Sequence, residues 1–156
     1  MPASNGHILI VEDDGDLLEV LKFVLEDEGY EVSTTERGSE ALSLAASQEP
    51  SLVLLDVTLP DIDGIEVAKQ LRADPRTRHL RLAIHTGLTA ERIREQFTDY
   101  DAFIAKAEEA DELVAAIKAA IAQPLRTRSR AAAEDTMPAG DGRPLPIADT
   151  DADARP

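Results

Sequence analysis

Residues 51–64 read SLVLLDVTLPDIDG, and this stretch decides the fold. Four consecutive apolar residues, Leu52 to Leu55, come before a loop that contains Pro60 and Gly64. A short apolar run bounded by turn residues is typical of a strand that is covered on both faces. Asp56 comes directly after this run. We therefore predict that its carboxylate lies at the C-terminal edge of the sheet, where open α/β sheets bind their ligands.

A second apolar run, His7–Val11, ends in the acidic sequence Glu12-Asp13-Asp14. Because parallel strands deliver their C-terminal ends to one edge, these acids and Asp56 are predicted to form an anionic pocket. Carboxylates that crowd together share a proton or bind a cation. Oxygen ligands suit a hard divalent metal, and a metal beside a carboxylate suggests phosphoryl chemistry.

The composition limits the class of protein. At 156 residues the chain is about one domain long. Its net charge of -15 makes direct binding to DNA or to an anionic membrane unfavourable. There is no cysteine, so disulfides and thiolate chemistry are excluded. The sequence shows neither an apolar run of transmembrane length nor a signal peptide, and a soluble cytoplasmic protein is expected.

The chain divides near residue 123. Residues 123–156 are rich in Pro, Ala, Arg and Asp, and they are predicted to be a disordered tail. Residues 6–122 alternate strand and helix patterns, which predicts a parallel sheet with helices on both faces. The predicted strands are His7–Val11, Tyr30–Thr34, Leu52–Leu55, Leu80–His85 and Ala102–Ala105. The predicted helices are Asp16–Glu28, Ser39–Gln48, one that begins near Gly64, Ala90–Phe97 and Asp111–Ala122.

Residues with reactive side chains follow four of the five predicted strands, and an aromatic residue lies within the last one. They are Glu12 and Asp13, Asp56, Thr86, Lys106, and Phe103. Together with the runs ILIVEDD at 8–14, LVLLDVTLPDIDG at 52–64 and AK at 105–106, this set resembles the receiver domain of bacterial two-component response regulators. The resemblance covers about residues 6–122. It implies a flavodoxin-like α/β fold with a five-stranded parallel sheet in the order 2-1-3-4-5.

The resemblance also implies roles for these residues. Asp56 would accept a phosphoryl group from a sensor histidine kinase or a histidine phosphotransfer protein. Glu12, Asp13, Asp56 and the backbone carbonyl of Thr58 would hold Mg²⁺, with Glu12 acting through water if the metal keeps several waters.

Lys106 would pair with a phosphoryl oxygen and Thr86 would donate its hydroxyl to another, while Phe103 turns inward. This would shift a two-state equilibrium and change the binding of a downstream protein. The chain would be no enzyme beyond its own phosphorylation and dephosphorylation.

The sequence departs from the family pattern in three places. Ala107 follows Lys106 where the family usually has a cis proline, and because a cis bond to a non-proline residue costs about 2.5–4 kcal/mol, we predict a trans peptide. The interval from Thr86 to Lys106 is shorter than usual, so the fourth helix or the loop after it must be trimmed. The usual Gly-Ala before the fifth strand is replaced by Thr98-Asp99-Tyr100.

Other interpretations of the same residues stay open. The acids at 12–14 could merely begin a helix, which is the interpretation we favour for Asp14. Asp61 and Asp63 could be metal ligands, but turn residues before Gly64 are favoured. A degenerate receiver that acts only as a phosphorylation-independent interaction domain is the main alternative function. A haloacid dehalogenase-type phosphatase would need an acid at position 58, which is Thr. A dinucleotide-binding domain would need a G-x-G-x-x-G motif after the first strand.

Overall fold

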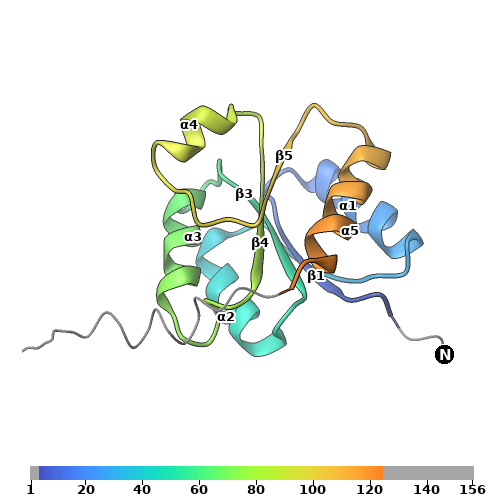
Figure 1. The fold of residues 1–156 in the computed structure, drawn as a ribbon, viewed down its shortest axis with the longest axis horizontal. Coiled ribbons are helices and arrows are strands. Elements are labelled where there is room, and N and C mark those ends of the chain that lie inside the picture. Colours follow the sequence, from blue (N-terminus) through green and yellow to red (C-terminus); the bar gives the residue numbers. More distant parts are fainter. Residues whose placement is uncertain (1–3, 125–156) are drawn as a thin grey trace, which may run out of the picture. The chain divides into compact units, whose positions relative to one another are not determined.

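The structure, a computed structural model, describes residues 4–124. Five parallel strands form one sheet in the order β2-β1-β3-β4-β5 (Figure 1), which confirms the predicted flavodoxin-like fold. All but the first two residues of the predicted tail, 123–156, lie outside the described residues.

Strands and helices alternate along the whole described chain. The strands are β1 (His7–Val11), β2 (Glu31–Thr35), β3 (Leu52–Asp56), β4 (Arg81–Thr86) and β5 (Ala102–Ala105). The helices are α1 (Gly15–Asp27), α2 (Gly38–Gln48), α3 (Gly64–Ala73), α4 (Ala90–Arg94) and α5 (Ala110–Ala122).

The fourth helix is the one clear error in the predicted elements. Instead of running from Ala90 to Phe97, α4 ends at Arg94. The N–H groups of Gln96 and Phe97 both donate to the carbonyl of Ile93, at 2.9 Å each, which tightens the chain into a turn. This turn brings Phe97 into the core, where it is 9% exposed.

The remaining boundaries match the predictions, as in β1 and β5, or differ from them by one residue. β2 and β4 lie one residue later than predicted, and β3 extends to Asp56. α1 lies one residue earlier, while α2 and α5 each begin one residue earlier. Differences of this size are usual at the ends of helices and strands, where hydrogen bonding is incomplete.

The sheet separates two apolar layers. On one face, Ala41 and Ala45 of α2, Val67 and Leu71 of α3 and Ile93 of α4 pack on the strands. On the other face, α1 and α5 contribute the buried residues Leu18, Leu21, Leu25, Leu113, Val114 and Ile117. Because both faces are covered, the central strands are apolar throughout: β3 is buried at every position.

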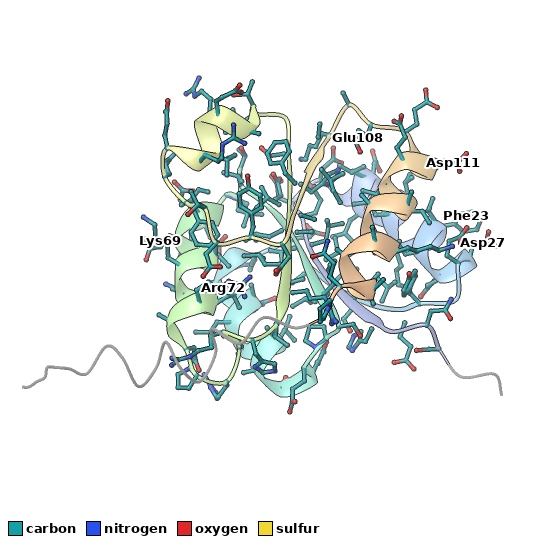
Figure 2. All side chains as sticks on the ribbon, in the orientation of Figure 1. Phe23, Asp27, Lys69, Arg72, Glu108 and Asp111 are labelled. Atoms are coloured by element: carbon teal, nitrogen blue, oxygen red, sulfur yellow. The ribbon has the colours of Figure 1, made fainter. Side chains whose placement is uncertain are left out.

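The outer surface of α1 is unusual for its apolar side chains. Phe23 points away from the sheet (Figure 2) and is 71% exposed, and Val20 on the same helix is 55% exposed.

None of the helices within residues 4–124 is long and apolar enough to cross a membrane.

Gly64 closes the loop between β3 and α3. Its N–H donates to the carbonyl of Val57 at 2.8 Å. A Cβ at this position would collide with the backbone of Asp56 and Val57. The loop that follows Asp56 can therefore fold back tightly only because residue 64 is glycine.

Candidate functional site

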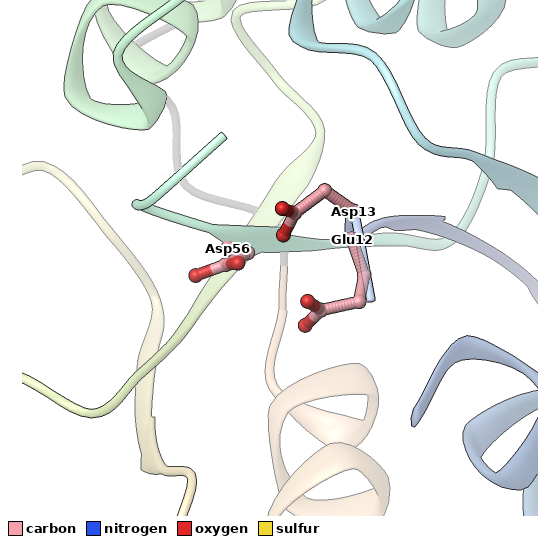
Figure 3. Close-up of side chains that lie close together, drawn as sticks. All are labelled: Glu12, Asp13 and Asp56. Carbon is pink, nitrogen blue, oxygen red and sulfur yellow. The ribbon is translucent and has the colours of Figure 1, made fainter. Parts of the chain in front are cut away.

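The three predicted metal-ligating carboxylates lie together at the C-terminal edge of the sheet (Figure 3). Asp56 is the last residue of β3 and is 2% exposed, and Glu12, directly after β1, is 1% exposed. Asp13 is exposed to solvent. One oxygen from each carboxylate lies within 4.8 Å of the others. Within residues 4–124 no other group of three or more acids or histidines is placed to hold a metal ion.

One buried oxygen in this cluster has no hydrogen bond. Oε2 of Glu12 accepts from the backbone N–H of Asp14 at 3.2 Å and from Nζ of Lys106 at 3.3 Å. Oε1 of Glu12 accepts from no donor, although Nζ of Lys106 lies 3.1 Å away. Three carboxylates thus lie together with Lys106 as the neighbouring ammonium, and they retain oxygen atoms for a cation. The residues therefore fit Mg²⁺, which prefers oxygen ligands.

Lys106 brings the positive charge of the site. Its Nζ lies 3.1 Å from Oδ2 of Asp56 as well as 3.1 Å from Oε1 of Glu12. Burial opposes the ammonium form, but Asp56 and Glu12 outweigh burial, and the pKa of Lys106 is raised. Burial and the charge of Asp56 raise the pKa of Glu12 to about 7, against the hydrogen bonds from Asp14 and Lys106. One ammonium therefore only partly compensates the crowded carboxylates.

The loop after β3 is held by side chains of its own. The N–H of Thr58 donates to Oδ1 of Asp56 at 3.1 Å, while Asp63 caps α3 by accepting from the N–H of Ile65 at 2.9 Å. Asp61 accepts from two N–H groups of α2. Asp63 therefore acts at the turn, as the preferred interpretation has it, whereas the Asp61 side chain bonds to a helix from another part of the chain. Asp14 likewise caps α1, accepting from Asp16 and Leu17.

Thr86 and Phe103 lie on neighbouring strands. Thr86 is 1% exposed and ends β4, and its Oγ1 accepts from the N–H of Leu88 at 3.2 Å. Thr86 pairs with Ala105, and Ile84 pairs with Phe103. Side chains alternate between faces along a strand, so Phe103 and Thr86 share one face of the sheet. The Phe103 ring is half-buried and tilts against the Tyr100 ring, with centroids 6.3 Å apart.

The loop after Lys106 has the predicted trans geometry, since no peptide bond within residues 4–124 is cis. The N–H of Lys106 donates to the carbonyl of Thr86 at 2.9 Å, which fixes the backbone at this point. A turn follows, in which the N–H of Glu108 donates to the carbonyl of Ala105 at 3.1 Å. The lysine therefore reaches the two carboxylates without the family's usual proline.

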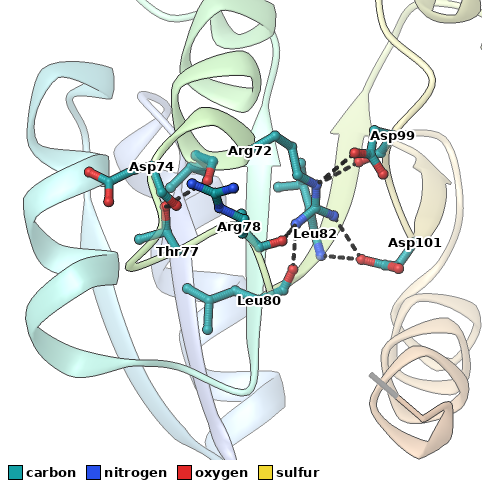
Figure 4. Close-up of polar contacts among 9 residues, drawn as sticks. Arg72, Asp74, Thr77, Arg78, Leu80, Leu82, Asp99 and Asp101 are labelled. Atoms are coloured by element: carbon teal, nitrogen blue, oxygen red, sulfur yellow. Dashed lines mark hydrogen bonds and ion pairs between the residues drawn. The ribbon is translucent and has the colours of Figure 1, made fainter. Parts of the chain in front are cut away.

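A second polar cluster, which no sequence pattern predicted, lies around Arg72 (Figure 4). The Arg72 side chain is only 8% exposed. It donates to the carbonyls of Asp99 and Leu80 at 2.8 and 2.6 Å, and to Oδ2 of Asp101 at 3.0 Å. The same Asp101 oxygen accepts from the N–H of Leu82 at 2.9 Å. These residues join α3, the start of β4 and the segment before β5.

His85 is a further buried group that sequence reasoning treated only as a strand position. It is 5% exposed and pairs with Asp56 across the sheet. Its side chain lines a cavity of about 100 Å³ between α1 and α5, together with Leu21, Lys106 and Leu113. Burial and the nearby charge of Lys106 lower the pKa of His85 to about 4, so the ring is neutral at pH 7.

Taken together, the site can bind and neutralise a phosphoryl group. Asp56 supplies a buried carboxylate, and Lys106 supplies a cation within 3.1 Å of it. The acids Glu12 and Asp13 add oxygen ligands for a divalent metal. A carboxylate in such surroundings can act as a nucleophile towards phosphorus.

Sequence comparisons agree with this chemistry. A family model described as "Response regulator receiver domain" matches residues 8–118. The transcriptional regulatory protein YkoG of Bacillus subtilis is 41% identical over 123 residues, which is 76% of this chain and 52% of that protein. The phosphate regulon regulator PhoB of Rhizobium meliloti is 39% identical over 114 residues, 72% of this chain and 50% of PhoB. This chain thus spans about half the length of these two relatives.

A shorter relative and two solved structures extend the comparison. The polar-differentiation response regulator DivK of Brucella anthropi is 37% identical over 99 residues, 61% of this chain and 78% of DivK. A CheY-like receiver from Methanospirillum hungatei has a TM-score of 0.68 and 29% identity, covering 74% of this chain and 92% of that one. The BeF3-activated receiver domain of Klebsiella pneumoniae RstA has a TM-score of 0.67 and 26% identity, covering 75% and 99%.

Proposed function

This chain belongs to the response regulator receiver family, and from that premise we propose that Asp56 accepts a phosphoryl group from a phosphohistidine. The donor is a sensor histidine kinase or a histidine phosphotransfer protein, the partners with which receiver domains interact. The observation that carries the proposal is the buried carboxylate of Asp56, placed 3.1 Å from Lys106 and within 4.8 Å of Glu12 and Asp13.

The transfer requires a rearrangement at Asp56. Its Oδ1 accepts from the N–H of Thr58, and its Oδ2 pairs with Lys106, so both oxygens have partners before the donor arrives. When a carboxylate oxygen attacks phosphorus, the bond from phosphorus to the histidine nitrogen breaks. The ammonium of Lys106 then moves from the carboxylate to a phosphoryl oxygen, which its long flexible side chain allows.

Glu12, Asp13, Asp56 and the carbonyl of Thr58 are the residues proposed to hold Mg²⁺. When bound, this ion neutralises charge on the phosphoryl oxygens and orients them for transfer. The protein's own part is to keep these oxygens close together, with Glu12 and Asp56 buried and Asp13 exposed to solvent. The ammonium of Lys106 offsets part of the repulsion between the carboxylates of Glu12 and Asp56.

The proposed signal starts at Thr86. Its Oγ1 accepts from Leu88, and a hydroxyl can accept and donate at once, so its proton is available to a phosphoryl oxygen. Movement of Thr86 towards the phosphoryl group would free space on the face of the sheet that it shares with Phe103. Phosphorylation then shifts the equilibrium between two arrangements of this face towards one of them, and a downstream protein binds that arrangement better.

The experiment is to incubate the chain with Mg²⁺ and phosphoramidate and to measure its intact mass. We expect a mass increase of one phosphoryl group, which is lost in Asp56→Asn. Because Asn is nearly the same size as Asp, this variant keeps the packing while it removes the nucleophilic carboxylate and the negative charge that pairs with Lys106.

Two results would contradict the proposal. Stoichiometric labelling of Asp56→Asn would move the site to another residue. No labelling of the parent chain at any Mg²⁺ concentration would favour the alternative of a phosphorylation-independent interaction domain.

A further inference from the structure

The loop between Asp56 and α3, residues 57–63, is fastened to a helix from another part of the chain. Asp61 reaches from this loop to the N-terminus of α2. Its Oδ1 accepts from the N–H of Gly38 at 3.0 Å, and its Oδ2 accepts from the N–H of Ser39 at 2.9 Å. The two segments are more than 20 residues apart in sequence.

The N-terminus of α2 has no capping side chain at its own N-cap position. Arg37 occupies the N-cap position of α2, and its side chain makes no capping hydrogen bond. The first N–H groups of a helix have no partner inside the helix, and the positive end of the helix dipole favours an anion. Asp61 lies outside the helix, accepts from two of these N–H groups and places a negative charge at the positive end of the helix dipole. Hydrogen bonding by the Ser39 side chain and backbone, with that of Gly38, lowers the pKa of Asp61 to about 2.

Packing makes the attachment close. A Cβ on Gly38 would collide with Ile62 and would lie 3.0 Å from the Leu59 side chain. Both Leu59 and Ile62 are partly buried against the core on the α2 and α3 face. The start of α2 and the loop therefore fit against each other through side chains as well as through the Asp61 hydrogen bonds.

The same loop carries the backbone of the phosphoryl-acceptor site. The N–H of Thr58 donates to Oδ1 of Asp56, and the carbonyl of Val57 accepts from Gly64 at the other end of the turn. Asp63 fixes the end of the loop to α3, while Asp61 fixes its middle to α2. A loop fastened at these points has little freedom to move the Thr58 carbonyl.

We propose that Asp61 is a positioning residue, which holds the 57–63 loop against α2 so that Thr58 stays in place to ligate Mg²⁺ beside Asp56. The inference rests on the proposed function only in taking Thr58 as part of the metal site. It assigns to Asp61 a task beyond turn formation, although Asp61 touches neither the metal nor the phosphoryl group.

The test separates positioning from helix stability by restoring the cap in another way. Asp61→Ala removes both hydrogen bonds, and Arg37→Ser gives α2 a local N-cap, since Ser at this position accepts from the next N–H groups. The full chain is examined as four proteins: the parent, each single variant and the double variant. Mg²⁺ affinity is measured by NMR titration of the backbone amides, and the melting temperature is recorded without metal.

We expect Asp61→Ala to lose about tenfold in Mg²⁺ affinity, the lower end of the range for outer-shell partners of a metal. Its melting temperature should also fall. The double variant should regain melting temperature but not Mg²⁺ affinity, and Arg37→Ser alone should bind Mg²⁺ like the parent. Unchanged affinity in Asp61→Ala, or affinity that recovers together with the melting temperature in the double variant, overturns the proposal.

Asp61→Asn gives an independent check if the alanine variant folds poorly. Its amide oxygen can still accept one N–H, so we expect a smaller loss of affinity than in Asp61→Ala, and parent-like affinity counts against the proposal. Labelling of the parent by phosphoramidate reports separately on the proposed function. If the parent is not labelled but Asp61→Ala still loses Mg²⁺ affinity, the proposed function fails and the positioning role stands.

Discussion

The charge state of Glu12 responds strongly to the site around it. Glu12 is 1% exposed, and burial together with the charge of Asp56 raises its pKa from 4.5 to about 7. A carboxyl group with a raised pKa in the folded state contributes stability below its unfolded pKa. It loses that contribution as the pH rises through the folded pKa. For Glu12, the window of this loss runs from about 4.5 to about 7.

Mg²⁺ binding should therefore depend on pH around neutrality. Because the metal needs the ionised carboxylate, its affinity for the chain is expected to rise between about pH 6 and pH 8 as Glu12 releases its proton. The same metal should raise the melting temperature more at pH 8 than at pH 6. NMR titration at several pH values measures the first effect, and thermal denaturation with and without Mg²⁺ measures the second.

Glu12→Gln is the matched control, since its amide does not titrate. Its Mg²⁺ affinity should be weaker and nearly flat over this pH range. A pH dependence in the variant that equals that of the parent would assign the titration to another group.

At the scale of elements, Arg72 joins three parts of the fold that the sequence does not relate. It binds carbonyls before β4 and β5 and forms an ion pair with Asp101, whose side chain is 7% exposed. Arg72→Ala should destabilise the domain by about 3–5 kcal/mol, the usual cost when one member of a buried ion pair is removed. Urea denaturation measures this free energy of unfolding.

Arg76→Ala is the matched control for Arg72→Ala, because Arg76 forms an ion pair on the surface instead of a buried one. It pairs with Asp74 at 2.8 Å on the surface, and its side chain is 64% exposed. Surface ion pairs contribute little because solvent screens them, so Arg76→Ala should leave the denaturation midpoint almost unchanged. Equal losses in the two variants would mean that the Arg72 cluster has no special role.

The elements also show what the sequence could and could not predict. The apolar runs ending at Val11 and Leu55 predicted two of the strands. Because parallel strands end at one edge of the sheet, these runs also predicted that Glu12, Asp13 and Asp56 meet. Asp61 was expected to be a turn residue, but its partners on α2 could not be foreseen, since they lie more than 20 residues away. The short interval from Thr86 to Lys106 predicted that the fourth helix or the loop after it is trimmed, and α4 is indeed short. Its end at Arg94 could not be foreseen, because it depends on Phe97 entering a core that only the folded chain creates.

At the scale of the whole molecule, the sequence predicts that residues 6–122 form the folded domain. The segment after residue 123 has no sustained apolar period, and from this composition we predict that it adds nothing to the core. Ending the chain after Pro124 keeps the contact in which Arg81 Nη2 donates to the carbonyl of Gln123 at 2.7 Å. We expect the shortened chain to melt at the same temperature and to be phosphorylated at the same rate. A clear fall in melting temperature would show that the removed residues stabilise the domain.

Chemical identification of the modified residue tests the central claim most directly. Borohydride reduces an aspartyl phosphate to homoserine, so the chain is treated with phosphoramidate and Mg²⁺, reduced and digested, and its peptides are sequenced by mass spectrometry. The account predicts homoserine at position 56 and at no other position. Homoserine at position 13, or at any other aspartate in place of Asp56, would contradict it.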